Sequence, residues 1–296
     1  MLSDLIGELP QLLVNGLVAG TILALPAIGF TAIYAVLRFP NFAIASHATM
    51  GAYAGYVANV WLGLPVIPSL LAAFLVPALS GMACDEVVLK PLRRTGPLTA
   101  AIAAVALTIA LENVIRFVFG NDLRGYDLPV WRDWRFDLGF AVLRIGPQQV
   151  ENAAISVAVM TAVFLFLAFT RTGKMMRAVA DNPMLAGIKG INADTVARLG
   201  SFMGMGLVGV GGMLLGLDTS IDPLTGFRAV LSVFAAAVVG GLGSIPGAVV
   251  GAAVVGVGEE LSLLVLDASY RTAVGFLAIV VVLLVRPRGI LGERAF

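Results

Sequence analysis

Few side chains in this 296-residue sequence have types and spacings that could do chemistry. Glu112 and Arg116 are four residues apart, so on a helix they share a face and can form an ion pair. Glu259 and Glu260 follow a long apolar run. His47 is the one histidine, and there is one cysteine, so no metal-ligand cluster or disulfide framework can be built. We therefore expect no metal site.

The sequence also offers no catalytic machinery. It contains no nucleophile–base pair and no G-x-x-x-x-G-K-[ST] loop that would hold nucleotide phosphates. We therefore expect a chain that is not an enzyme and binds no cofactor. If ATP and Mg²⁺ drive its work, they must be bound by another chain.

Composition places the chain in a membrane. Hydrophobic residues make up 59% of the sequence and charged residues 12%, whereas a soluble domain carries about 25% charged residues. The apolar runs have lengths that suit the hydrocarbon core of a bilayer. We predict an all-α polytopic membrane protein with one transmembrane domain over residues 1–296. The net charge of +1 says nothing about partners, and nucleic acid is not expected.

Hydropathy predicts about eight to nine transmembrane helices, some of them short or broken. The segment at 229–242 is short for a full crossing. Several glycine pairs at a spacing of four predict faces where helix backbones approach closely. The predicted segments are 11–37, 42–62, 66–88, 98–119, 148–170, 199–217, 229–242, 246–266 and 272–285, and the glycine pairs are Gly16/Gly20, Gly51/Gly55, Gly212/Gly216 and Gly247/Gly251.

Two stretches rich in small residues predict breaks in the helices. One begins at Arg38 and contains Pro40 and Asn41, and the other is Gly240-Gly-Leu-Gly-Ser-Ile-Pro-Gly247. Glycine and proline disfavour an uninterrupted helix there. The second break is either part of a pathway or hinge, or a simple turn between two helices. One break in each half also suggests an internal repeat, as many transporters have.

Lysine and arginine orient the predicted helices, because cytoplasmic loops carry an excess of both. The cations gather at Lys90–Arg94, in 171–198, and at Arg286, Arg288 and Arg294. We therefore place these regions and the C-terminus inside, and the N-terminus outside. The 120–147 segment balances arginine against aspartate and contains Trp131 and Trp134, which is typical of an outer loop.

The segment from Arg171 to Arg198 is polar and charged, and it lies between two apolar runs. It carries five Lys/Arg and two Asp and reads as a helix, a turn and the start of a second helix. A transporter that takes its energy from a separate motor protein needs such a cytoplasmic element. We interpret 171–198 as a candidate docking loop, although a solvated, positively charged loop explains the cations equally well.

Several motifs in this order resemble the permeases of branched-chain amino acid ABC importers, the LivH-type family. The resemblance extends over nearly the whole chain. The motifs are Asn41-Phe-Ala with Met50-Gly-Ala-Tyr53, Lys90-Pro-Leu-Arg93, Gly173-Lys-Met-Met-Arg177-Ala178 with Asp181, Ala186 and Gly190-Ile-Asn192, Ile221-Asp-Pro223 with Gly226-Phe227, Gly240–Gly247, Glu259 and Pro287-Arg-Gly-Ile-Leu-Gly292.

The resemblance implies an ABC importer permease fold, in which this chain forms half of a translocation pathway in a bacterial inner membrane. It implies a second related permease subunit, two cytoplasmic ATP-binding subunits and a periplasmic substrate-binding protein as partners. It also implies that the 171–198 segment is the ATPase coupling loop. The residues it assigns there are Gly173, Arg177, Ala178, Asp181, Asn182, Ala186, Gly190 and Ile191.

Polar residues in or near the spans are candidates for the substrate pathway, because charges inside a membrane are usually functional. Each also has a plainer interpretation: Glu112 in an ion pair, Glu259 at the membrane boundary, His47 in a structural hydrogen bond. The candidates are Asn41, Ser46, His47, Glu112, Asn113, Gly241, Ser244 and Glu259.

One departure from the family pattern concerns the substrate. The family has His-Gly directly after Asn-Phe-Ala, whereas this sequence has Ile44 and Ala45 there and its histidine at position 47. Related small polar or amphipathic solutes are therefore alternatives to branched-chain amino acids. A stand-alone secondary transporter or channel without an ATPase is the alternative function, with Glu112 or Glu259/Glu260 for ion coupling.

Overall fold

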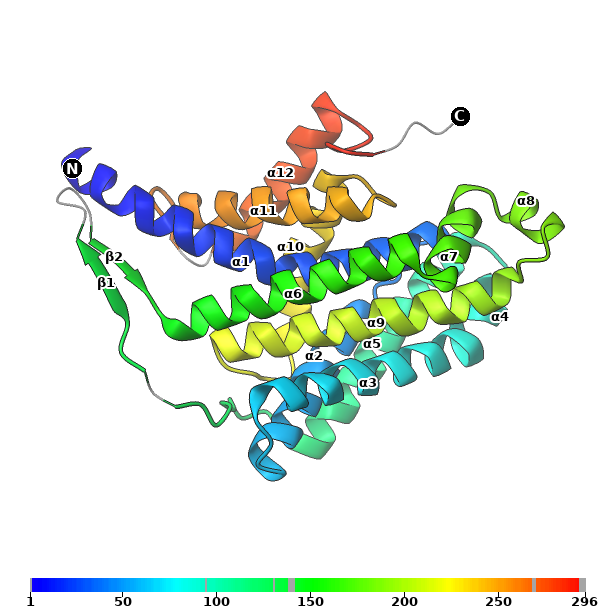
Figure 1. The fold of residues 1–296 in the computed structure, drawn as a ribbon, viewed down its shortest axis with the longest axis horizontal. Helices are drawn as coiled ribbons and strands as arrows, with labels where there is room; N and C mark the ends of the chain where they lie inside the picture. The colour runs from blue at the N-terminus through cyan, green and yellow to red at the C-terminus, as the bar shows by residue number, and fades with distance from the viewer. Residues whose placement is uncertain (1, 94, 130, 138–141, 268–269, 293–296) are drawn as a thin grey trace.

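The computed structural model describes residues 2–93, 95–129, 131–137, 142–267 and 270–292 (Figure 1). Helices dominate. The elements are α1 (Leu2–Leu37), α2 (Ile44–Tyr56), α3 (Val66–Cys84), α4 (Lys90–Arg93), α5 (Pro97–Phe119), α6 (Pro147–Phe169), α7 (Arg171–Asp181), α8 (Pro183–Ile188), α9 (Ala193–Asp218), α10 (Thr225–Gly240), α11 (Ile245–Ser262) and α12 (Arg271–Val285), with π-helical turns η1 (Val57–Trp61) and η2 (Asp85–Leu89) and strands β1 (Trp134–Asp137) and β2 (Val142–Ile145).

The helical architecture agrees with a multi-pass membrane protein. Among the described residues, 6 helices are long and apolar enough to cross a membrane, and α10 and α12 are shorter apolar helices. Each predicted hydrophobic segment contains a helix. The predicted count of eight to nine crossings is not confirmed, because α2 has 13 residues, α10 has 16 and α12 has 15, against the ~20 that a full crossing needs.

Helix α1 is the central scaffold, and it packs along both α11 and α9 (Figure 1). Glycines allow the backbones of these helices to approach one another closely. A Cβ on Gly256 of α11 would lie 2.6 Å from the backbone nitrogen of Gly20, and a Cβ on Gly204 of α9 would lie 2.7 Å from the carbonyl oxygen of Gly29. Helices in lipid associate through such close packing, because the surrounding tails are as apolar as the side chains.

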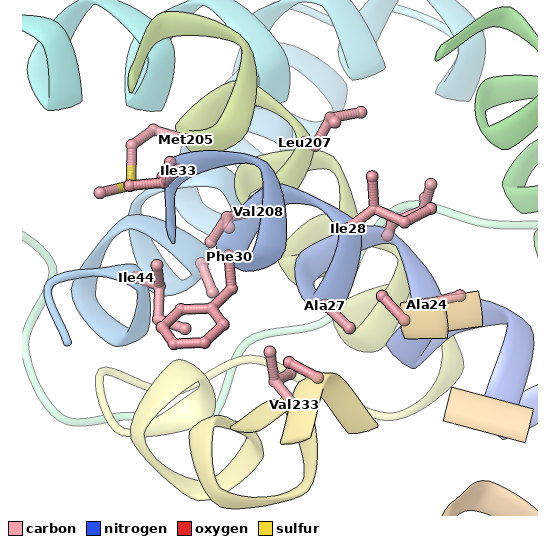
Figure 2. Close-up of a cluster of buried hydrophobic side chains, with 14 of the residues drawn as sticks. Ala24, Ala27, Ile28, Phe30, Ile33, Ile44, Met205, Leu207, Val208 and Val233 are labelled. Carbon is pink, nitrogen blue, oxygen red and sulfur yellow. The ribbon is translucent and has the colours of Figure 1, made fainter. Parts of the chain in front are cut away.

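The core lies where α1, α2, α9 and α10 meet. Figure 2 shows Phe30 and Ile33 of α1 beside Ile44 of α2, Val208 of α9 and Val233 of α10. All five side chains are almost fully buried. These inner helices therefore form the rigid centre, whereas α3, α5 and α6 turn most of their surface outward.

Both predicted breaks are present. After α1 the chain leaves the helix at Arg38, which has a φ of 57°, and re-enters one at Ile44. The Thr108 hydroxyl, near the middle of α5, donates to the carbonyl oxygen of Phe42 at 3.0 Å, so this break lies beside the middle of α5. The second break is the tight turn between α10 and α11, where Gly241 and Gly243 have positive φ.

A β-hairpin is the departure from the predicted all-α fold. Strands β1 and β2 pair antiparallel within the segment that we expected to be an outer loop. Gln11 of α1 binds the edge of β2, since its side chain donates to the Arg144 carbonyl at 2.9 Å and accepts from the Arg144 amide at 2.7 Å. The hairpin and the N-terminal end of α1 lie together (Figure 1).

The cationic segments gather at the opposite end of the molecule. Helices α4 and α7 lie at the end away from the hairpin (Figure 1). The segment after α12 packs on the α10–α11 turn, where the Leu291 amide donates to the Gly240 carbonyl at 2.9 Å, and this turn lines a groove with α7. Arg94 and Arg294, which contributed to the predicted orientation, lie outside the described residues. The described cations of these segments thus share one end, as the positive-inside pattern requires.

The packing of α1 on α11 predicts the effect of an added methyl group. Gly256→Ala should destabilise the fold by about 1–3 kcal/mol, since the new Cβ overlaps the α1 backbone. Gly258→Ala is the matched control, because the nearest atom to a Cβ there is 4.0 Å away. Thermal unfolding of the purified chain in detergent measures the stability of both variants. Equal unfolding midpoints for the two variants would contradict the close contact between α1 and α11.

Candidate functional site

Helices α7 and α8 form a compact polar element between α6 and α9. A side chain caps the start of each helix in this region. At the start of α7, the Thr170 hydroxyl accepts a hydrogen bond from the Gly173 amide at 3.0 Å. At the start of α8, the Asn182 side chain accepts one from the Leu185 amide at 3.0 Å. At the start of α9, the Asn192 side chain accepts one from the Asp194 amide at 2.9 Å. Such caps fix where each helix begins, so the turns between the helices have defined geometry.

Two contacts fix α7 against the membrane helices. Gly173 is buried against the last turns of α6, and a Cβ there would lie 2.5 Å from the Cα of Leu167. Arg38, just after α1, donates from its guanidinium to the carbonyl oxygen of Ala180 near the end of α7. The element therefore contacts both α6 and the end of α1.

Helix α8 presents apolar side chains to the outside. Met184 is 79% exposed, Leu185 54% and Ile188 76%, whereas Ala186 faces inward with 3% exposure. Large apolar groups gathered on an exposed, polar element mark a contact with another protein or with a membrane. The sequence contained this signal as Met184, Leu185 and Ile188 within the 171–198 segment, but the sequence analysis did not identify it.

The structure brings the predicted coupling residues into this one element. Helix α7 carries Gly173, Arg177, Ala178 and Asp181. Asn182 caps α8, and Ala186 is the buried residue of α8. The turn that follows contains Gly190, with a φ of 81°, and Ile191. The Ile191 amide donates to the Ala186 carbonyl at 3.0 Å, and Arg177 donates to the Ala168 carbonyl at 3.3 Å.

An ionic network connects the start of α9 to the end of the third helix. Glu86 of η2 accepts from Lys90 at 2.8 Å and from Arg198 of α9 at 2.8 Å, and Lys90 also lies 3.2 Å from Asp194. Beside it, Arg93 forms a 2.8 Å ion pair with the buried carboxylate of Asp85. The sequence did not reveal this network, because the two ion pairs that join α9 to Glu86 and Lys90 connect residues about a hundred positions apart.

Three predicted pathway residues gather at the start of α2. The Asn41 side chain accepts from the Ala43 amide at 3.1 Å, and the Ser46 hydroxyl donates to the Ala43 carbonyl at 3.0 Å. His47 Nδ1 lies 2.6 Å from the same carbonyl oxygen. All three side chains are buried, and within the residues that the structure describes His47 Nε2 and Asn41 Nδ2 have no hydrogen-bond partner. The geometry agrees with the structural interpretation of His47 and leaves two free polar atoms.

The acidic candidates lie in ion pairs at two other places. On α5, Glu112 pairs with Arg116 at 3.3 Å, as the spacing predicted, and Asn113 is exposed and donates to the Ile109 carbonyl at 2.7 Å. On α11, buried Glu259 accepts from the Ser232 hydroxyl of α10 at 2.6 Å and lies 3.7 Å from Arg271 of α12.

The remaining candidates flank the α10–α11 turn. Gly241 is buried against the C-terminal segment near Gly292, and Ser244 caps α11 by accepting from the Gly247 amide at 3.2 Å. The eight predicted pathway residues thus lie in four places, at the start of α2, on α5, at the α10–α11 turn and near the end of α11. Among the described residues, no hydrogen bond or ion pair joins a candidate residue of one place to a candidate residue of another. Whether any of these residues contacts substrate stays a prediction.

Comparison with known proteins gives relatives over nearly the whole chain. The high-affinity branched-chain amino acid transport system permease proteins LivH of Salmonella typhimurium and of Escherichia coli K12 are each 32% identical, over 96% of this chain and 95% of theirs. The corresponding BraD of Pseudomonas aeruginosa is 34% identical with the same coverage.

A solved structure shares the fold. PsaBC from Streptococcus pneumoniae, in complex with a Fab, aligns with a TM-score of 0.51 over 97% of both chains, at 15% sequence identity. Residues 12–285 match the family described as branched-chain amino acid transport system / permease component. The chain is therefore a member of this permease family.

Proposed function

We propose that the chain forms half of the translocation pathway of an ATP-driven importer, and that the α7–α8 element is where the ATPase binds. The observation that supports the docking assignment most directly is the exposed apolar surface of Met184, Leu185 and Ile188. Three capped helix starts hold this surface in place, and Gly173 seats it against α6. A rigid element of this kind can pass on force from a bound motor.

The proposed assembly has this chain, a second related permease subunit, two cytoplasmic ATP-binding subunits and a periplasmic substrate-binding protein. ATP and Mg²⁺ would be bound in the ATP-binding subunits. The cations at the α7 end favour a cytoplasmic position for that end and for the C-terminus. The hairpin end and the N-terminus would then face the periplasm of a bacterial inner membrane.

The proposed substrates are branched-chain amino acids or a related small amphipathic solute. The names of the LivH and BraD relatives support this class. The buried polar atoms at the start of α2, Asn41 Nδ2 and His47 Nε2, support a polar contribution from that region, because buried polar atoms normally have partners. The stand-alone transporter is less favoured, since the described Glu112 and Glu259 carboxylates both lie in ion pairs.

A charge on the exposed face of α8 should separate the ATPase from the permease. Ile188→Asp places a carboxylate in the proposed apolar contact, and we expect ATPase binding to weaken by about thirtyfold, as for an interface hot spot. Co-purification of the ATP-binding subunits with the permease measures it. Leu123→Asp is the matched control, since Leu123 is 70% exposed in the loop after α5. Normal ATPase retention by Ile188→Asp would refute the docking assignment.

Moving α7 away from α6 should uncouple ATP hydrolysis from transport. Gly173→Ala forces a Cβ into Leu167, whereas Gly187→Ala on α8 adds a methyl group where no atom lies within 4 Å. We expect Gly173→Ala to lower substrate uptake per ATP hydrolysed at least severalfold, and Gly187→Ala to leave this ratio unchanged. Uptake and phosphate release in proteoliposomes measure the ratio. Equal ratios for the two variants would show that the α6–α7 contact does not carry the coupling.

A further inference from the structure

A groove of about 680 Å³ opens beside α7, with α1 as its floor. Ala32, Ala35 and Val36 of α1 form the floor, and Phe164, Leu167 and Ala168 of α6 form one wall. The α10–α11 turn and the start of α11 close the other side, and α7 closes the end. The volume lies in the range of about 300–1,000 Å³ that is typical of small-molecule pockets.

The groove lies beside two candidate membrane-spanning helices. Its floor and wall belong to α1 and α6, two of the helices long and apolar enough to span a membrane. Ala32 and Phe164 lie five residues before the ends of their helices, Leu37 and Phe169, which is about 8 Å at 1.5 Å per residue. With these helix ends placed at the cytoplasmic membrane surface, as the proposed orientation has them, the groove would reach the outer part of the acyl-chain region.

Two cations line this largely apolar groove. Lys174 and Arg177 of α7 line it, one helical turn apart. Within the described part of the chain neither of them forms an ion pair, and Arg177 donates one hydrogen bond to the Ala168 carbonyl at 3.3 Å. Asp181 also lines the groove, so the three side chains leave one net positive charge there.

We propose that this groove binds an anionic phospholipid of the cytoplasmic leaflet. The phosphate lies between Lys174 and Arg177, and an acyl chain lies along Ala32, Ala35 and Phe164. Apolar walls from candidate membrane-spanning helices suit an acyl chain, and the two cations that line the groove suit a phosphate. Basic pockets between transmembrane helices on the cytoplasmic side recognise anionic head groups in this way. The proposal relies on the proposed orientation, with α7 on the cytoplasmic side.

Fluorescence quenching by lipids with brominated acyl chains tests this proposal. Phe164→Trp places a reporter in the groove wall, and the parent chain gives the background of the three native tryptophans. The full chain is placed in phosphatidylcholine nanodiscs that contain a small fraction of brominated phosphatidylglycerol or, separately, brominated phosphatidylcholine. We expect stronger quenching by phosphatidylglycerol, with an enrichment of about fivefold for each cation.

Lys174→Gln with Arg177→Gln should abolish the preference for phosphatidylglycerol. Arg171→Gln with Lys189→Gln is the charge-matched control, since both residues are exposed and do not line the groove. Equal quenching by the two lipids would overturn the proposal. Absence of quenching of the tryptophan at position 164 by either lipid would also overturn it, because a protein segment would then fill the groove.

Lipid retention by the unmodified sequence gives a second measurement. Native mass spectrometry of the full chain after detergent exchange should show one bound phosphatidylglycerol, which the Lys174/Arg177 double variant loses and the Arg171/Lys189 double variant keeps. If neither the parent chain nor the control variant keeps a bound phosphatidylglycerol, the proposed site is wrong. Because no step uses ATP or an ATPase, failure here is distinct from failure of the proposed function.

Discussion

The close approach of α1 to α9 and α11 is the constraint on which the rest of the structure depends. In lipid there is no hydrophobic force between helices, so association requires close backbone packing and hydrogen bonds. Gly20 meets Gly256, and Gly29 meets Gly204, at distances that leave no room for a side chain. With α1 held in this way, the helices around it have fixed positions, and so does α7, which contacts Arg38 just after the end of α1.

The α7–α8 element depends on α1 through short-range contacts. Arg38 follows α1 directly and binds the Ala180 carbonyl of α7, while Gly173 seats α7 on the end of α6. The same arrangement creates the groove over Ala32 and Ala35, because α6 and the α10–α11 turn flank α1 on its two sides. The proposed motor contact on α8 and the proposed lipid site beside α7 therefore belong to one element, and both depend on where α1 lies.

The sequence predicted those features that arise from local chemistry. Apolar runs predicted the helices, and the glycines at 241 and 243 predicted the break that their positive φ values confirm. The ion pair of Glu112 with Arg116 followed from spacing alone. Contacts between distant segments could not be predicted, because spacing carries no information about Arg198 reaching Glu86 or Ser232 reaching Glu259. The β-hairpin was missed because its strands have four residues each and are largely exposed, so they lack a clear apolar pattern.

Site-specific photo-crosslinking from α8 tests the docking assignment most directly. A photoreactive amino acid at position 188 is placed on the exposed face of α8, and the same group at position 123 in the loop after α5 provides the reference. In the assembled transporter, the account predicts a crosslink from position 188 to an ATP-binding subunit and none from position 123. A crosslink to the ATP-binding subunit from position 123, with none from position 188, would contradict both the docking site and the proposed orientation.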